Sequence, residues 1–146
     1  MISLVMDTSN SYLAVGLYQD NMCLEAFQEK GSRRQSEKAI PTLKEVLDCH
    51  DIALKDVDEM IITSGPGSYT GVRVAMTIAK TLAAVSDVKI KSVSSLAAYA
   101  GMNQALSVID ARGHKVFVGV YENGLPLIKE QVMTLEDFAQ LRAEYS

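Results

Sequence analysis

Several residue types that carry catalysis or covalent stabilisation are scarce in this sequence of 146 residues. It has no tryptophan, two histidines and two cysteines, and Cys23 and Cys49 form no Cys-x-x-Cys pair. A disulfide framework needs more cysteines and a zinc ribbon needs paired ones, so both classes are excluded. His50 and His114 are far apart in the sequence and form no zinc-binding motif. We therefore predict that the chain holds no metal.

Long apolar runs and an excess of positive charge are also missing. No stretch approaches the roughly 18 apolar residues of a membrane-spanning helix, and no basic region precedes Asp7 as in a signal peptide. We therefore expect a cytoplasmic protein with no membrane partner. Fourteen basic against eighteen acidic residues give a formal net charge of −4, which argues against a stand-alone nucleic-acid binder. A nucleic-acid role through a basic partner stays open.

What the sequence does contain is an alternation of short apolar strands and amphipathic segments. Apolar residues recur every three or four positions in two stretches, which predicts helices there. The expected strands are residues 2–6, 12–18, 21–27, 60–63 and 89–93, and the expected long helices are 36–49 and 70–85. This order of elements predicts an α/β fold.

The sequence pattern at the beginning of the chain recurs after Gly101. The run 106–109 ends at Asp110 as the first run ends at Asp7, and this offset of 103 residues places segment 13–18 on 116–121. Both segments carry a Gly-x-Tyr pair before a turn, which favours a duplicated unit over chance agreement between two hairpins. The duplication predicts an N-terminal lobe over residues 1–103. We expect 104–146 to be the start of a second lobe, truncated at Ser146.

Residues 64–71 form a glycine-rich loop between a predicted strand and a predicted helix. Such a loop can direct amide N–H groups and a helix N-terminus at an anion, although its spacing matches neither a Walker nor a G-x-G-x-x-G motif. The alternative is that the glycines only permit a tight turn. Similarly, the two strand-end aspartates can hold a metal-bound phosphate or merely open turns. The candidate nucleotide- or anion-binding residues are Asp7, Thr8, Ser9, Gly65, Gly67, Ser68, Tyr69, Thr70, Gly71, Arg73 and Asp110.

No nucleophile or general base is suggested by any spacing, so no catalytic residue is predicted. The helix expected over 70–85 has small residues at helical spacing, Ala75, Ala79 and Ala83, with Val72 and Met76 beside them. Small residues let a second helix approach closely. This face can therefore pack within the domain or against a partner.

Five segments together resemble the bacterial TsaB (YeaZ) family, in order and over essentially the whole chain. The most specific is Ser-Gly-Pro-Gly-Ser-Tyr-Thr-Gly-Val-Arg at 64–73; the others are 4–9, 35–41, 93–96 and 108–112. The resemblance implies an actin-like ATPase (ribonuclease H-like) fold. That fold has duplicated βββαβαβα lobes, of which the second is incomplete in this chain.

The resemblance also implies a function. Members of this family act as non-catalytic partners of a TsaD-like catalytic paralogue and a TsaE-like ATPase. Together these proteins transfer threonylcarbamoyl to adenosine 37 of tRNAs that read codons starting with A. It further implies that the chain has no activity alone, that ATP and Mg²⁺ are bound mainly by the partners, and that tRNA contact is indirect. The alternative is an actin-like ATPase or phosphotransferase that binds nucleotide at Gly65–Gly71.

In this family the pairing surface uses the first two long helices, and the isolated protein is expected to form a homodimer. The resemblance thus implies partner contacts by Val72, Ala75, Met76, Ala79, Ala83, Ser36, Ala39, Ile40 and Leu43. The sequence departs from the family at Gln35, where relatives often carry histidine, and in its length.

Overall fold

The computed structural model describes residues 1–31 and 35–145 and contains two compact units, each with its own β-sheet. The first unit comprises Met1–Ser64 and Ser68–Val93. The second comprises Gly65–Gly67 and Ser94–Ser146. The glycine-rich loop is therefore divided between the units, because Gly65–Gly67 groups with the second one.

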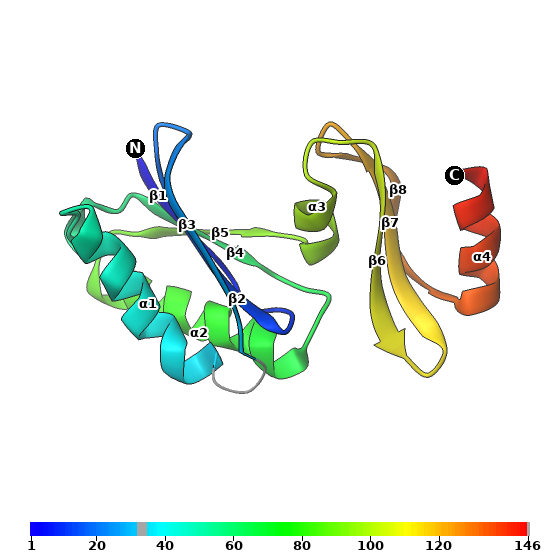
Figure 1. The fold of residues 1–146 in the computed structure, drawn as a ribbon, viewed down its shortest axis with the longest axis horizontal. Helices are drawn as coiled ribbons and strands as arrows, with labels where there is room; N and C mark the ends of the chain where they lie inside the picture. Colours follow the sequence, from blue (N-terminus) through cyan, green and yellow to red (C-terminus); the bar gives the residue numbers. More distant parts are fainter. Residues whose placement is uncertain (32–34, 146) are drawn as a thin grey trace. The chain divides into compact units, whose positions relative to one another are not determined.

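The first unit is a five-stranded sheet with strand order β3-β2-β1-β4-β5. The strands are β1 (Ile2–Asp7), β2 (Tyr12–Gln19), β3 (Met22–Lys30), β4 (Glu59–Thr63) and β5 (Lys89–Val93). The first three strands are antiparallel, and β4 and β5 run parallel to β1. Helices α1 (Gln35–Cys49) and α2 (Tyr69–Val85) cover one face of this sheet (Figure 1), and the 3₁₀ turn η1 (Leu54–Asp56) precedes β4.

The core of the first unit follows from alternation along the strands. Leu4 and Met6 of β1 point to the same face as Leu13, Val15 and Leu17 of β2, and all five are buried. The two helices complete this core with buried apolar residues on their inner faces: Ala39, Leu43, Val46 and Leu47 of α1, and Ala75, Ile78 and Ala79 of α2. Both long helices predicted from periodicity are confirmed, and each begins one residue earlier than predicted.

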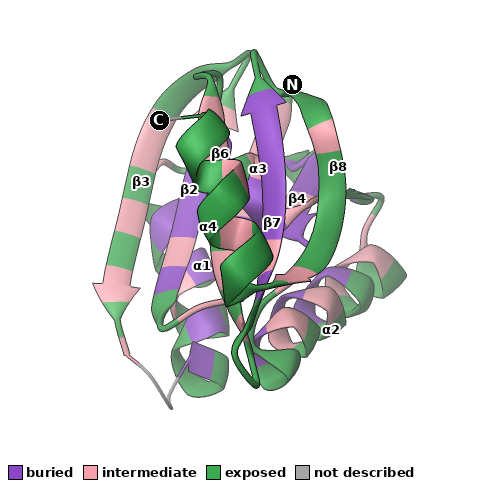
Figure 2. Cartoon of the chain, turned by 90° about the vertical axis from the view of Figure 1, so that its right-hand side faces the viewer, coloured by how far each residue is buried: buried purple, intermediate pink, exposed green. Residues whose placement is uncertain are grey.

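The second unit is a three-stranded antiparallel sheet flanked by two helices. Its elements are α3 (Ser95–Ala100), β6 (Ala105–Arg112), β7 (Lys115–Glu122), β8 (Leu125–Thr134) and α4 (Leu135–Glu144). Leu96 and Ala100 of α3 pack with Tyr121 on one face, while α4 contacts β7 and β8 from the other (Figure 1). The most buried strand is the central one, β7 (Figure 2).

The duplicated hairpin predicted from the sequence is present in both units. Strands β2 and β7 are related by the offset of 103 residues, and each is followed by a two-residue turn. Asp20 and Asn21 have φ of 50° and 68°, and Asn123 and Gly124 have φ of 52° and 78°. Positive φ at both positions defines a type I′ turn, whose twist matches that of the flanking strands. The two hairpins are therefore built by the same local rule.

One detail of the predicted repeat is wrong, because β6 is shifted by one residue. Asp7 pairs with Ala14, whose equivalent in the repeat is Phe117, but Phe117 pairs with Ile109. Asp110 instead pairs with Val116, and an irregularity follows it in the strand. A shift of one residue exchanges the faces of a strand. Ile109 and not Asp110 thus occupies the register position of Asp7, and the predicted equivalence of the two aspartates is corrected.

The boundary predicted after residue 103 also differs from the division between the compact units, which falls after Val93. The reason is the packing of α3, which the prediction assigned to the first lobe. Leu96 is fully buried against the second sheet, and Ser107 of β6 donates a hydrogen bond to its carbonyl oxygen (2.7 Å). Helix α3 therefore belongs to the second unit.

The repeated Gly-x-Tyr pair generates a first prediction. A Cβ added to Gly119 would lie 2.7 Å from the Tyr121 ring, and one added to Gly16 would lie 2.8 Å from the Tyr18 ring. Tyr121 is buried and its hydroxyl donates to Glu130 (2.6 Å), whereas Tyr18 is only half-buried, with more open space around its ring. Gly119→Ala should cost about 2 kcal/mol of unfolding free energy and Gly16→Ala about 1 kcal/mol. Urea denaturation of both variants measures the two unfolding free energies. Equal costs would contradict the difference that we expect from the surroundings of the two tyrosines.

A second prediction concerns Glu59, a nearly buried carboxylate on β4. Lys91 (2.7 Å) and the Ser3 hydroxyl (2.8 Å) hold its pKa below the ordinary value of 4.5. A carboxylate whose pKa is lower in the folded than in the unfolded protein stabilises the fold at pH values above its unfolded-state pKa. This stabilisation is lost as the pH falls through the pKa of the folded state. Glu59→Gln should therefore cost about 1 kcal/mol at pH 7 and progressively less below pH 4.5. Urea denaturation of the wild type and the variant between pH 7 and pH values below 4.5 measures this cost. A loss of unfolding free energy that does not change with pH would show that the ion pair is not its cause.

Candidate functional site

The start of α2 rests directly on the end of β1. Thr8 is fully buried, and its hydroxyl donates a hydrogen bond to the carbonyl oxygen of Gly71 (2.5 Å). A Cβ added to Gly71 would collide with the carbonyl oxygen of Thr8. Glycine at position 71 is therefore required for the close approach of two backbones, a role that the sequence reasoning did not propose for the glycine-rich loop.

The polar groups around this contact are bonded to one another. Oδ1 of Asp7 accepts from the Ser9 amide (2.8 Å), the Ser9 hydroxyl (2.6 Å) and the Thr63 hydroxyl (2.7 Å). The Ser68 amide donates to the carbonyl oxygen of Ser9 (2.8 Å), and the Ser68 hydroxyl caps α2 by accepting from the Gly71 amide (3.1 Å). The end of β1 and the first turn of α2 thus form one hydrogen-bonded junction.

The hydrogen-bonded junction contains part of the predicted anion-binding site. The structure brings Asp7, Thr8, Ser9, Ser68 and Gly71 together, as the sequence suggested. However, Thr8, Ser9 and Gly71 are buried, so in this structure they bind the protein itself and are not open to a nucleotide. The other predicted members divide between the units: Tyr69, Thr70 and Arg73 are exposed on α2, while Gly65, Gly67 and Asp110 belong to the second unit.

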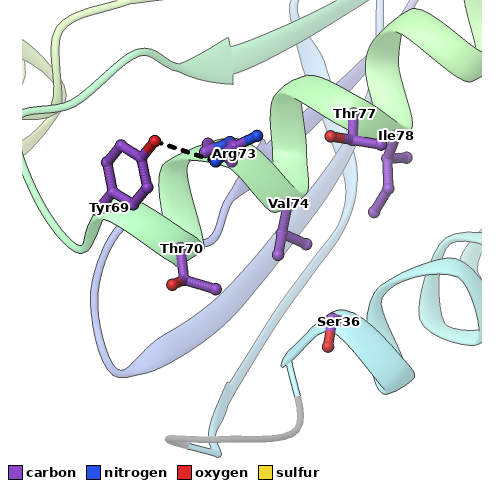
Figure 3. Close-up of a pocket in the computed structure, with 7 residues that line it drawn as sticks. All are labelled: Ser36, Tyr69, Thr70, Arg73, Val74, Thr77 and Ile78. Carbon is purple, nitrogen blue, oxygen red and sulfur yellow. Dashed lines mark hydrogen bonds between the residues drawn. The ribbon is translucent and has the colours of Figure 1, made fainter.

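A cavity of about 390 Å³ lies between the beginning of α1 and the first half of α2 (Figure 3). Its lining consists of Ser36 from α1 and Tyr69, Thr70, Arg73, Val74, Thr77 and Ile78 from α2. The Arg73 guanidinium lies 5.2 Å from the centroid of the Tyr69 ring and donates to its hydroxyl (3.0 Å). The cavity therefore combines an apolar floor with hydroxyl groups and one cation. Val74, Thr77 and Ile78 were missed by the sequence reasoning, although their helical spacing from Thr70 could have revealed them.

The predicted docking residues fall into two groups. Ala39, Leu43, Ala75 and Ala79 are buried in the core of the first unit, so the prediction that they contact a partner is corrected. Their small or branched side chains let the helices approach their own sheet and not a foreign helix. The remaining five are accessible: Ser36 and Ile40 are exposed, and Val72, Met76 and Ala83 are half-buried.

Gln35 is a structural residue. Its side-chain amide is buried and donates to the carbonyl oxygens of Asn10 (2.6 Å) and Tyr12 (2.8 Å). These bonds tie the beginning of α1 to the β1–β2 connection. The sequence singled out Gln35 only as a departure from the family, because nothing in it indicates which distant carbonyl groups the amide meets.

Within residues 1–31 and 35–145, no three histidine, cysteine, aspartate or glutamate side chains are grouped so that they could hold a metal ion. Nor does any helix in these ranges have the length and apolar character needed to cross a membrane.

Comparison with known families gives a match over residues 28–144 to the family of TsaD, tRNA N6-adenosine threonylcarbamoyltransferase. Two curated relatives are named tRNA threonylcarbamoyladenosine biosynthesis protein TsaB. The Bacillus subtilis relative is 33% identical, over 99% of this chain and 67% of its own length. The Escherichia coli relative is 30% identical, over 84% of this chain and 57% of its own length. The chain thus spans little more than half to two thirds of these relatives.

A solved structure with a similar fold is YeaZ from Pseudomonas aeruginosa. It superposes with a TM-score of 0.80 and 29% identity, covering 90% of this chain and 67% of that one. The α/β fold predicted from the sequence is thereby confirmed.

The contact between Thr8 and Gly71 generates a third prediction. Gly71→Ala should lower the unfolding free energy by about 3 kcal/mol or more, because the new methyl group meets a backbone atom that cannot turn aside. Thr8→Val, which replaces the hydroxyl with a methyl group and so removes the hydrogen bond, should cost about 1–2 kcal/mol. Thermal and urea unfolding measure both. A Gly71→Ala protein as stable as the wild type would show that the two backbones separate freely.

Proposed function

Because the chain belongs to the TsaB (YeaZ) family, we propose that it is a non-catalytic partner of a TsaD-like enzyme that forms threonylcarbamoyladenosine in tRNA. In this role the chain binds the catalytic paralogue and holds it in an active arrangement. A TsaE-like ATPase completes the system. The relatives are longer than this chain, so the proposal attributes to it the part of their role that the two units described above can perform.

The observation that carries this proposal is the contrast between the two candidate sites. The polar junction between β1 and α2 is closed by its own hydrogen bonds. In contrast, the outer side of α1 and α2 offers a cavity and accessible apolar side chains, among them Ile40 with 57% of its surface exposed. Protein interfaces are built from such patches, in which apolar contacts are surrounded by polar groups. The geometry thus favours docking over nucleotide chemistry.

The remaining assignments follow from this role. ATP and Mg²⁺ are bound mainly by the partner subunits, and the acidic chain contacts tRNA only through them, in the cytoplasm. In the absence of the paralogue, two copies of the chain pair through the same helices. We name the accessible set Ser36, Ile40, Val72, Met76 and Ala83 the docking surface.

Reconstitution tests the proposed function. The paralogue, the ATPase, tRNA, threonine, bicarbonate and ATP are combined with and without this chain, and modified nucleoside is measured by mass spectrometry. Product should form only when the chain is present. Equal product in both reactions would overturn the proposal.

A fourth prediction concerns the docking surface itself. Met76→Glu places a charge among its half-buried residues and should weaken binding to the paralogue by at least tenfold, because the carboxylate would lose water on docking. Thr81→Glu adds the same charge on the same helix at an exposed position outside the surface and should change binding less than twofold. Isothermal titration calorimetry measures both. Equal effects would mean that net charge, and not this surface, governs binding.

A further inference from the structure

Strand β6 lies at the edge of the second sheet, and its outer side has no partner strand among residues 1–31 and 35–145. In the repeat, β6 corresponds to β1, which has β2 on one side and β4 on the other. A strand with one neighbour presents a row of backbone N–H and C=O groups along its free side. The outer side of β6 is therefore available for pairing with another strand.

The side chains of β6 are also less covered than those of β1. By their register, Leu106 and Val108 correspond to Leu4 and Met6 of the first unit. Leu4 and Met6 are fully buried, whereas Leu106 is half-buried and Val108 has 41% of its surface exposed. The first unit buries these positions because β4 and α2 lie against β1. Strand β6 thus presents apolar side chains next to its free backbone groups.

The other three sheet edges have residues that oppose the addition of a strand. Charged side chains, lysine above all, and proline have this effect. These residues are Glu25, Glu29 and Lys30 on β3, Lys89 and Lys91 on β5, and Pro126, Lys129 and Glu130 on β8. Residues 105–109 of β6 are Ala-Leu-Ser-Val-Ile, with neither charge nor proline. Within the described part of the chain, β6 is therefore the sheet edge best suited to accept a strand.

We propose that two copies of the chain pair through β6, edge to edge and antiparallel, so that their second sheets join into one sheet with three strands from each copy. Around a twofold axis at Ser107, Leu106 of each copy lies opposite Val108 of the other. Opposed apolar side chains on neighbouring strands stabilise a sheet, and the pairing covers the exposed surface of Val108. The proposal goes beyond the function proposed above and does not depend on it.

Charge and symmetry favour a second copy over a strand from another protein. In this register residues 105–109 meet only uncharged residues, and Asp110 lies opposite Gln104 and not opposite a second carboxylate. An isologous pair closes the β6 edges of both copies at once. A foreign strand would cover one edge and present its own outer side instead. Pairing of β6 with β8 of another copy would bring Pro126, which has no amide N–H, into the new ladder.

Substitution near the centre of the β6 edge tests this pairing. The background is Met76→Glu, which removes any pairing through the docking surface on α2, and in it the chain should sediment as a dimer. Adding Val108→Lys should raise the dimer Kd at least tenfold, because the ammonium group would lose water when the strands pair. The control Val132→Lys places the same charge on β8, at a valine that is 51% exposed, and should change the Kd less than twofold. Sedimentation equilibrium measures all three chains.

The outcomes distinguish pairing through β6 from pairing through the helices. A monomeric Met76→Glu chain would overturn the proposal, as would equal effects of the two lysines or aggregates without a defined size. If Met76→Glu and the wild type form the same dimer, and Val108→Lys dissociates it, pairing through β6 stands and pairing of two copies through the helices is wrong.

Hydrogen exchange of the wild-type chain tests the proposal without any substitution. Alternate amide groups of residues 105–109 point away from β7. These amides should exchange more slowly at protein concentrations above the dimer Kd than below it, whereas the amides of β8 should not change. Exchange in β6 that is independent of concentration would overturn the proposal.

Discussion

The first turn of α2 lies against the end of β1 so closely that no side chain fits between their backbones. Gly71 makes this approach possible, and the hydroxyl of Thr8 closes it with a hydrogen bond to the Gly71 carbonyl oxygen. The position and direction of α2 over the sheet follow from this contact. The burial of Ala75 and Ala79 depends on it in turn, as does the exposure of the opposite side of the helix.

This contact also explains why a loop with the composition of a phosphate-binding site has another role. Glycine-rich loops before helices bind anions when their amide groups point at open solvent. Here the Ser68 amide donates to Ser9, the Gly71 amide donates to the Ser68 hydroxyl, and Asp7 accepts from its own neighbours. These groups instead hold the beginning of α2 against the end of β1. The outer faces of α1 and α2 remain accessible.

The features that the sequence predicted well are those that local rules determine. Short apolar runs predicted the strands, and a spacing of three and four predicted α1 and α2. The common offset with its Gly-x-Tyr pairs, at Gly16 and Gly119, indicated the repeat. The failures have non-local causes. The register of β6 depends on an irregularity after Asp110, which no composition indicates. Small residues at Ala75 and Ala79 predicted close packing correctly but not whether the neighbour was a partner or the chain's own sheet.

In the proposed function, the chain works through the outer faces of α1 and α2. Hydrogen–deuterium exchange of the chain with and without the paralogue tests this most directly, because it reports protection along the whole backbone in one experiment. We expect added protection in Gln35–Cys49 and Tyr69–Val85, with the second sheet unchanged. Protection confined to β6, β7 and β8, with both long helices unaffected, would contradict it.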